Sequence, residues 1–196
     1  VQVGAHPGLP DLRGFGRRNM AISPADAELD VMYQIGALKA FCQAAGVPLH
    51  HVKPHGALYN MAAKDPALAQ AICRAVQAAA PEAMLLALSG SEMLKAAQEM
   101  GLRVCSEVFA DRAYRADGTL VPRGLPGAMI ENEDDAIARV IQMAKQGTVC
   151  AADGSTVTLQ ADSVCVHGDG RKALCFVKQL SEALPAAGIE IKAHSA

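Results

Sequence analysis

The chain has 196 residues, of which 51% are hydrophobic and 19% are charged, and its 18 basic against 20 acidic residues give a net charge of −2. This is the composition of a globular domain with a sizeable core, and the near balance of charge gives no general attraction for nucleic acid. The most apolar stretch, residues 67–88, is interrupted by Arg74, Pro81 and Glu82, so no run reaches the roughly 20 apolar residues of a membrane span. We therefore expect no nucleic acid and no membrane among the partners.

The six cysteines are widely spaced within apolar segments, with no CxxC pair and no cluster of zinc-site spacing. Unpaired cysteines are most often small buried hydrophobic residues, and we expect the same here, with a disulfide or a reactive thiol as the alternative. The pattern predicts a reducing compartment and hence a cytoplasmic location.

The first half of the chain alternates short apolar runs with segments of helical periodicity. One helix is expected to begin after the N-cap residue Ser23 and to end at Gly46, and Pro66 and Pro81 bound a second helix. In chain order, the predicted segments are strand 1–5, loop 6–18, helix 24–45, strand 49–53, loop 54–60, helix 65–80, strand 84–88, helix 92–101 and strand 103–107.

The second half opens with a long predicted loop, residues 108–129, which contains the turn signal Asp117-Gly118. Residues 148–159 alternate around Asp153-Gly154, and this pattern predicts a peripheral β-hairpin. The remaining predicted segments are helix 132–145, strand 163–166, turn 167–170, helix 172–187 and strand 189–192.

The alternation of strands and helices predicts an α/β fold with parallel strands and right-handed crossovers. About six strands are compatible with an open doubly wound sheet or with most of a (β/α) barrel. Polar residues favour the barrel, because they follow the ends of at least four strands and a barrel gathers all such ends at one rim, whereas an open sheet gathers only those beside its switch point. In strand order, these residues are His6, then Lys53 and His55, then Glu107, Asp111 and Arg112, then His167 and Asp169.

Each of these residues also has a purely structural interpretation. His6 can simply cap a turn, and Glu107 can form a structural salt bridge with Arg112 instead of belonging to a site. The turn at residues 167–170 offers glycines and a following helix N-terminus to an anion, or it is a plain turn. The cations of residues 13–18 clamp an anionic group or form a solvated basic loop.

Several short strings occur in order from the first residue almost to the last. They are residues 4–7 (GAHP), 15–17 (FGR), 33–38 (YQIGAL), 52–60 (VKPHGALYN), 107–114 (EVFADRAY), 117–123 (DGTLVPR) and 166–169 (VHGD). Together these strings resemble the LamB/YcsF family of lactam-utilisation proteins, and no single motif has to carry the likeness.

The resemblance implies a TIM-like (β/α)7 barrel related to the polysaccharide deacetylases, here as a single domain over residues 1–196 with a small peripheral β-hairpin insertion. It also implies the A subunit of the bacterial ATP-dependent 5-oxoprolinase, a hydrolase of cyclic amide C–N bonds. That enzyme opens the lactam of 5-oxo-L-proline to L-glutamate together with subunits B and C. Family members begin with two further motifs, Asp-Leu-Asn-x-Asp-Leu-Gly-Glu and Gly-Phe-His-Ala-Gly-Asp, which precede Val1, so an N-terminally incomplete barrel is expected.

Two other classes of function stay open. A metal-dependent deacetylase or amidohydrolase is suggested by the related fold and by three histidines at strand ends, and activity without ATP would favour it. A non-catalytic scaffold subunit of an amide-hydrolysing complex is the second class, and binding of partner subunits without binding of the lactam would favour it.

The resemblance places the strand-end residues in the site, with ATP as a co-substrate that partner subunits would handle and with a divalent metal left open. Lys53 and Arg112 would stabilise negative charge on oxygen, and His55 or His167 would act as general acid or base, oriented by an aspartate. The candidate catalytic residues are His6, Lys53, His55, Glu107, Asp111, Arg112, His167 and Asp169, and the candidate substrate-binding residues are Arg17, Tyr59, Arg123 and Gly168.

Overall fold

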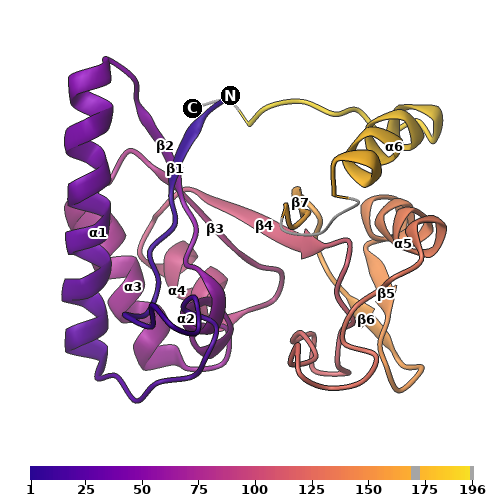
Figure 1. Ribbon diagram of the computed structural model, residues 1–196, viewed down its shortest axis with the longest axis horizontal. Helices are drawn as coiled ribbons and strands as arrows, with labels where there is room; N and C mark the ends of the chain where they lie inside the picture. Colours follow the sequence, from indigo (N-terminus) through magenta and orange to yellow (C-terminus); the bar gives the residue numbers. More distant parts are fainter. Residues whose placement is uncertain (169–172, 195–196) are drawn as a thin grey trace. The chain divides into compact units, whose positions relative to one another are not determined.

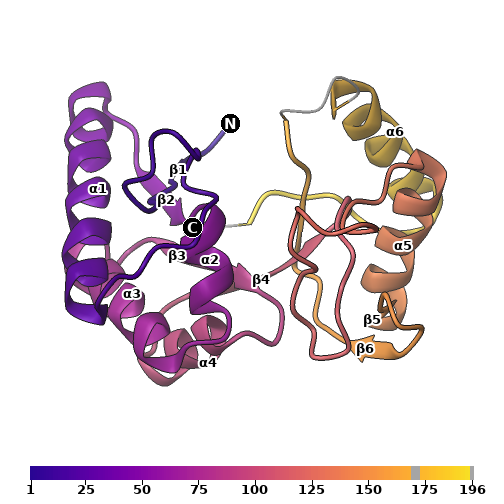
Figure 2. The same ribbon diagram turned by 60° about the horizontal axis from the view of Figure 1, so that its bottom comes forward.

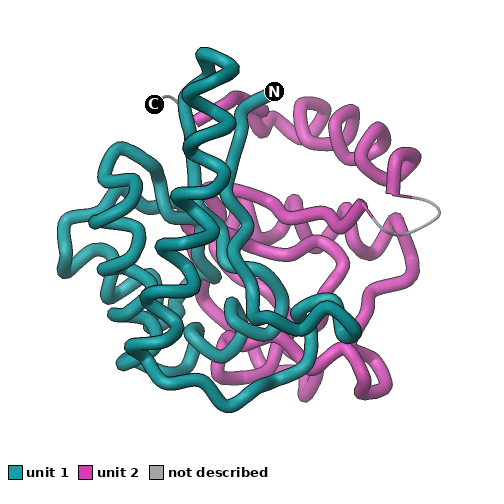
Figure 3. Tube along the Cα trace, turned by 60° about the vertical axis from the view of Figure 1, so that its left-hand side comes forward, with its two compact units in different colours: residues 1–105, 196 teal, residues 106–195 magenta. Residues whose placement is uncertain are grey.

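The computed structural model describes residues 1–168 and 173–194, and the chain forms two compact units, Val1–Cys105 and Ser106–Ser195 (Figures 1 and 3). The boundary falls within strand β4 (Val104–Phe109), so the first two residues of that strand belong to the first unit. Both units combine helices with parallel strand pairs, and the α/β class predicted from the sequence is confirmed.

Three short parallel strands form the centre of the first unit, in the order β1-β2-β3. They are β1 (Val3–Ala5), β2 (Leu49–Val52) and β3 (Met84–Leu88). The N–H of Leu85 donates to the carbonyl of Arg103 at 2.8 Å, which places the start of β4 beside β3. Val52 and Leu85 are fully buried, so the strands form the middle of the core of this unit.

Four helices belong to the first unit: α1 (Pro24–Ala45), α2 (Gly56–Ala62), α3 (Pro66–Ala79) and α4 (Glu92–Glu99). Helix α1 begins where the sequence predicts, because the Ser23 hydroxyl accepts the N–H of Asp26 at 3.1 Å, and it ends at Gly46 in the left-handed conformation. Helices α1 and α3 lie side by side in Figures 1 and 2 and bury Val31, Ile35 and Ile72.

Helix α2 lies where the sequence predicts a loop over residues 54–60. It has only seven residues, too few for a helical period to stand out, and it follows Pro54, which favours an extended backbone at the residue before it. Leu58 and Tyr59 are almost completely buried, so tertiary packing stabilises a helix too short to be stable alone. The prediction of a loop was therefore wrong from Gly56 onward.

In the second unit, the remainder of β4 pairs in parallel with β7 (Ser163–Cys165), and helices α5 (Glu133–Gln146) and α6 (Ala173–Ala186) pack side by side (Figure 2). Strands β5 (Thr148–Cys150) and β6 (Thr156–Thr158) pair antiparallel around the Asp153-Gly154 turn, in the segment where the sequence predicts a hairpin.

The last strand predicted from the sequence, residues 189–192, is not present as a strand. Ile191 is 54% exposed, so this apolar segment has not found the partner that a buried strand requires.

The structure shows no disulfide among the six cysteines, and Cys42, Cys73 and Cys105 are buried as expected. Cys150 and Cys175 are exposed, so the prediction of burial was wrong for these two. Within the described ranges, no helix combines the length and the apolar character needed to cross a membrane.

Candidate functional site

Two of the predicted histidines lie side by side in the first unit, just past the ends of β1 and β2. The parallel pairing continues beyond the strands, because the N–H of Lys53 donates to the Ala5 carbonyl at 2.9 Å and the N–H of His55 donates to the Pro7 carbonyl at 2.8 Å. His6 and His55 are therefore held on adjacent segments of backbone, as the strand-end argument predicts for this unit.

The rings of His6 and His55 form a hydrogen-bonded chain between two backbone carbonyls. Nδ1 of His6 lies 2.5 Å from the carbonyl oxygen of Lys53, and Nε2 of His6 lies 3.0 Å from Nδ1 of His55. Nε2 of His55 then lies 2.7 Å from the carbonyl oxygen of Phe15, whose ring meets the His55 ring edge to face at 5.2 Å. All four ring nitrogens are thus engaged.

The surroundings of His6 favour its neutral form. Desolvation by the neighbouring protein lowers its pKa to about 4, and the positive charges of His55, Lys53 and His51 act in the same direction, against the raising effect of its hydrogen bond to the Lys53 carbonyl. The residue as a whole is nevertheless exposed.

The loop that supplies the Phe15 carbonyl is fixed by a buried carboxylate. Asp11 accepts the N–H of Gly14 at 2.9 Å and bonds to the guanidinium of Arg18, and these contacts lower its pKa to about 2. Phe15 has a left-handed backbone, φ 54°, and the guanidinium carbon of the exposed Arg17 lies 5.4 Å from its ring centroid. Arg17 is thus held near His55, whereas Tyr59 is buried within α2.

A carboxylate and an imidazole are paired in the second unit, just past the ends of β4 and β7. Nδ1 of His167 lies 2.8 Å from Oδ2 of Asp111, and the His167 ring stacks on Phe109 with ring centroids 5.8 Å apart and an interplanar angle of 24°. Because an ionised carboxylate only accepts hydrogen bonds, Nδ1 of His167 donates, and Nε2 of the neutral ring carries the lone pair. The pair has the arrangement of an oriented general base.

Arg112 and Glu107 do not form the ion pair considered from the sequence. Nη2 of Arg112 instead donates to the carbonyl of Val121 at 2.5 Å, because the backbone turns the buried guanidinium toward its own loop. Desolvation lowers the pKa of Arg112 to about 10, and the nearby charge of Arg123 adds to the effect. Within residues 1–168 and 173–194, Nε of Arg112 and Oδ1 of Asp111 are buried without a hydrogen-bond partner.

The predicted site residues thus fall into two groups. Those in the first unit are His6, Arg17, Lys53, His55 and Tyr59; those in the second unit are Glu107, Asp111, Arg112, Arg123, His167 and Gly168. Asp169 lies outside the described residues. The side chain of Arg123 contacts Met129, with Nη1 3.6 Å from Sδ, and Gly168 directly follows His167.

Three contributing residues were missed by the sequence interpretation. Phe15 contributes a carbonyl, Phe109 a stacking ring, and Tyr114 a buried hydroxyl that accepts the N–H of Phe109 at 2.9 Å. None of these roles requires an ionisable side chain, so a search for acids, bases and metal ligands passes over them. Their only signal is that each lies within a string of the family resemblance.

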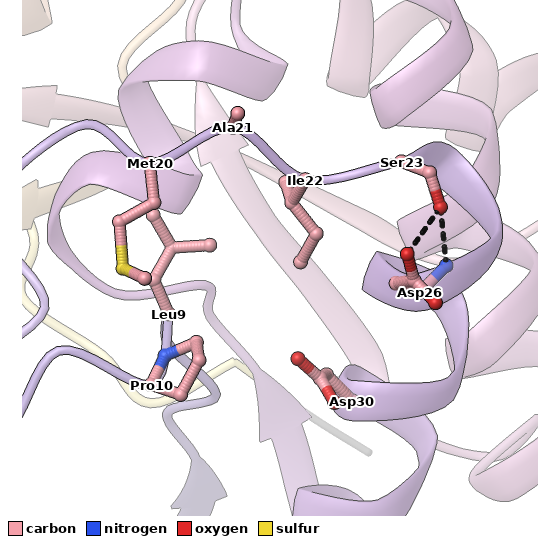
Figure 4. Close-up of a pocket in the computed structure, with 8 residues that line it drawn as sticks. All are labelled: Leu9, Pro10, Met20, Ala21, Ile22, Ser23, Asp26 and Asp30. Carbon is pink, nitrogen blue, oxygen red and sulfur yellow. Dashed lines mark hydrogen bonds between the residues drawn. The ribbon is translucent and has the colours of Figure 1, made fainter.

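A pocket of about 420 Å³ also opens in the first unit, between the loop after β1 and the start of α1 (Figure 4). Its lining residues are Leu9, Pro10, Met20, Ala21, Ile22, Ser23, Asp26 and Asp30. These include none of the predicted catalytic or substrate-binding residues. In the part of the chain that the structure describes, no three His, Cys, Asp or Glu side chains are placed to hold a metal ion.

Comparison with known proteins shows what the chain is similar to. Residues 1–196 match the family model described as LamB/YcsF family. The chain is 58% identical over 191 residues to the 5-oxoprolinase A subunit of Clostridium beijerinckii, covering 97% of this chain and 75% of that protein. It is 55% identical over 195 residues to the 5-oxoprolinase A subunit of Bacillus subtilis, covering 100% of this chain and 76% of that protein. The crystal structure of a lactam utilization protein from Thermus thermophilus matches with a TM-score of 0.88 at 48% identity, over 99% of this chain and 77% of that one.

Proposed function

This chain belongs to the LamB/YcsF family, and on that premise we propose that it is the A subunit of an ATP-dependent 5-oxoprolinase, which opens the lactam of 5-oxo-L-proline to L-glutamate. Similar proteins at 52–58% identity carry the name of the 5-oxoprolinase A subunit, which supports the assignment. The structural observation that supports this function most directly is the hydrogen bond between His167 and Asp111. Hydrolysis of an amide requires an oriented base, and this contact orients the His167 ring.

The five-membered lactam is an unstrained amide, so opening it requires an activated carbonyl, an activated water and a proton for the leaving nitrogen. Transfer of the γ-phosphoryl group of ATP to the carbonyl oxygen would activate the carbon. Addition of the water oxygen, cleavage of the ring C–N bond, protonation of the nitrogen and release of phosphate then give L-glutamate, ADP and inorganic phosphate. We assign the handling of ATP to partner subunits B and C, because the sequence contains no GxxxxGK loop.

In this proposal His167 is the general base that takes a proton from water. Its Nδ1 proton is held by Asp111, which fixes the tautomer with the lone pair on Nε2 and stabilises the imidazolium that forms. Phe109 limits rotation of the ring by stacking on it. Asp111 therefore acts as a positioning residue and not as the base itself.

The cations of both units have a proposed electrostatic role. Arg112 is buried, and one of its N–H groups has no partner within the described residues, so it has a donor left for developing negative charge on oxygen. Lys53, in the first unit, follows β2 directly and is proposed to stabilise negative charge in the same way. Arg17 in the first unit and Arg123 in the second are each proposed as a substrate-binding residue, since a guanidinium can bind a carboxylate.

The proposal also includes the architecture and the setting of the protein. Parallel strands alternating with helices, together with the match to the Thermus thermophilus structure, support a TIM-like barrel. Six cysteines without a disulfide among them favour a reducing compartment and thus a cytoplasmic location.

The test is an assay of glutamate formed from 5-oxo-L-proline and ATP by the protein with its two partner subunits. We expect His167→Gln to lower turnover by about 10²–10⁴-fold, the usual contribution of a general base, and His194→Gln, at an exposed histidine, to leave it unchanged. Wild-type turnover in His167→Gln would overturn the assigned base. Hydrolysis that needs no ATP would indicate an amidohydrolase or deacetylase, and partner binding without lactam binding would indicate a scaffold subunit.

A further inference from the structure

We propose that His6 and His55 form an imidazole–imidazolium pair that holds three ring protons and one positive charge, with His6 neutral and His55 as the cation. The chain of contacts has three links: His6 to the Lys53 carbonyl, His6 to His55, and His55 to the Phe15 carbonyl. Each link needs one N–H, because a carbonyl oxygen only accepts. Two neutral imidazoles supply two protons, so the third link requires one more.

The geometry also fixes where the protons lie. A proton on Nδ1 of His6 satisfies the Lys53 carbonyl and a proton on Nε2 of His55 satisfies the Phe15 carbonyl. The third proton lies between Nε2 of His6 and Nδ1 of His55, which are 3.0 Å apart. If this proton left, two lone pairs would face each other across that distance, so the neutral pair loses one hydrogen bond and gains a repulsive contact.

The surroundings place the charge on His55 and not on His6. Desolvation and the charges of Lys53 and His51 oppose a cation at His6, and its pKa falls to about 4. The His55 ring faces the Phe15 carbonyl and ring, and the carbonyl oxygen accepts its Nε2 proton. The guanidinium of Arg17, on the other side of the Phe15 contact, is a like charge that opposes the cation at His55. No carboxylate hydrogen-bonds to either ring within the described segments, so the carbonyl dipole and the His6 lone pair stabilise the extra proton.

A general acid needs a proton that it can give up, and the extra proton of this pair is not held by a carboxylate. Its assigned use is to protonate the nitrogen released on lactam opening, and this use rests on the proposed function. Because Nδ1 of His55 donates to Nε2 of His6 in the resting protein, the proton is transferred only as that hydrogen bond breaks and the lactam nitrogen replaces Nε2 of His6 as the acceptor. His6 is then a positioning residue that accepts the proton of His55 and fixes its ring, whereas the proton count itself stands on the geometry alone.

The direct test is NMR of the wild-type protein labelled with ¹⁵N in its histidines, followed over the pH range in which imidazoles titrate. We expect His6 to be neutral with its proton on Nδ1 and His55 to carry protons on both nitrogens. We also expect a coupling through the hydrogen bond between Nε2 of His6 and Nδ1 of His55. Three of the four ring nitrogens thus carry a proton, and Nε2 of His6 does not. A pair with two protons throughout, or a proton on Nε2 of His6 at neutral pH, would overturn the proposal.

A variant separates this inference from the proposed function. His6→Ala removes the acceptor, and we expect Nδ1 of His55 to carry no proton at neutral pH in this variant, because the hydrogen bond that holds that proton is lost. His194→Gln, with its ring on the Asp162 carbonyl in the wild type, is the matched control and leaves the ¹⁵N signals of His55 unchanged. A proton retained on Nδ1 of His55 in folded His6→Ala contradicts the pair. If the wild-type protein gives the predicted spectra but His55→Gln keeps full turnover, the proton count holds and the role of His55 as general acid is wrong.

Discussion

His167 donates its Nδ1 proton to Oδ2 of Asp111 over 2.8 Å, and the register of two strands accounts for this contact. Phe109 pairs with Cys165 at the ends of β4 and β7, and the bond from Ala110 N–H to the Cys165 carbonyl continues the parallel arrangement. Asp111 and His167 each lie two residues further on. The backbone hydrogen bonds between β4 and β7 therefore place Asp111 and His167 next to each other.

We predict that Asp111→Asn lowers glutamate formation by about 10²-fold or more, because the neutral amide no longer favours the Nδ1–H tautomer or the imidazolium of His167. The measurement is turnover with the partner subunits at saturating 5-oxo-L-proline. In the double variant with His167→Gln we expect little further loss, since the two residues act as one unit. Additive losses would contradict the pairing as a functional relationship.

A second prediction concerns the backbone that positions His55. Gly56 has φ 56°, and a Cβ there would lie 2.5 Å from the carbonyl oxygen of Gly16, which is itself fixed by the N–H of Ala57 at 2.8 Å. Gly46 has φ 65° with open space around it. The substitution Gly→Ala introduces the same left-handed strain of about 1–2 kcal/mol at both positions, and only Gly56→Ala adds a backbone clash.

We therefore expect Gly56→Ala to lower the free energy of unfolding by about 1–3 kcal/mol more than Gly46→Ala does, the usual range for overpacking. Urea unfolding of the two variants measures the difference. We also expect Gly56→Ala alone to change the ¹⁵N spectrum of His55. Equal destabilisation by the two variants would show that the loop shifts freely around Gly16.

The strand and helix pattern was largely predictable from the sequence, because caps and periodicity are local signals. Ser23 and Gly46 bound α1 as predicted, since a hydroxyl cap and a left-handed glycine act within a few residues. Helix α2 was not predictable, because burial of Tyr59 stabilises it and no local periodicity announces it. The prediction of a strand at residues 189–192 was wrong, because an apolar run forms a strand only when it has a neighbouring strand to pair with.

The candidate site divides in the same way. The position of His6 and His55 past adjacent strands followed from the chain order, whereas their link to the Phe15 carbonyl depends on a left-handed residue in a loop that Asp11 fixes. The contact of Arg112 with the Val121 carbonyl likewise arises within a loop that has no repeating pattern. Residues at the ends of parallel strands can be predicted from a sequence, because the strands run in one direction and their ends lie at one edge. Contacts made within a loop cannot, because a loop has no repeating pattern.

A third prediction tests the support beneath His167. The buried hydroxyl of Tyr114 accepts the N–H of Phe109 at 2.9 Å, and Phe109 stacks on His167. Tyr114→Phe keeps the ring and removes the acceptor, so we expect a loss of about 1–3 kcal/mol in the free energy of unfolding. Tyr33→Phe is the matched control on the exposed face of α1, where Tyr33 is 76% exposed, and we expect a change within about 0.5 kcal/mol. Thermal and urea unfolding measure both, and equal effects of the two changes would contradict the assigned hydrogen bond.

The last prediction concerns acid and the loop that presents the Phe15 carbonyl. Asp11 accepts Nε of Arg18 at 3.0 Å and the N–H of Gly14 at 2.9 Å, and Arg18 is the largest cause of its pKa of about 2. Because this pKa is lower in the folded than in the unfolded chain, the contact stabilises the fold above about pH 4, and this stabilisation is lost as pH falls toward about 2.

Arg18→Gln should raise the pKa of Asp11 and reduce the pH dependence of unfolding in that interval. The matched control is Arg13→Gln at an exposed arginine of the same loop, which should leave both unchanged. Carboxyl NMR titration reports the pKa directly, and an Asp11 pKa still near 2 in Arg18→Gln would show that the loop backbone, and not the guanidinium, lowers it.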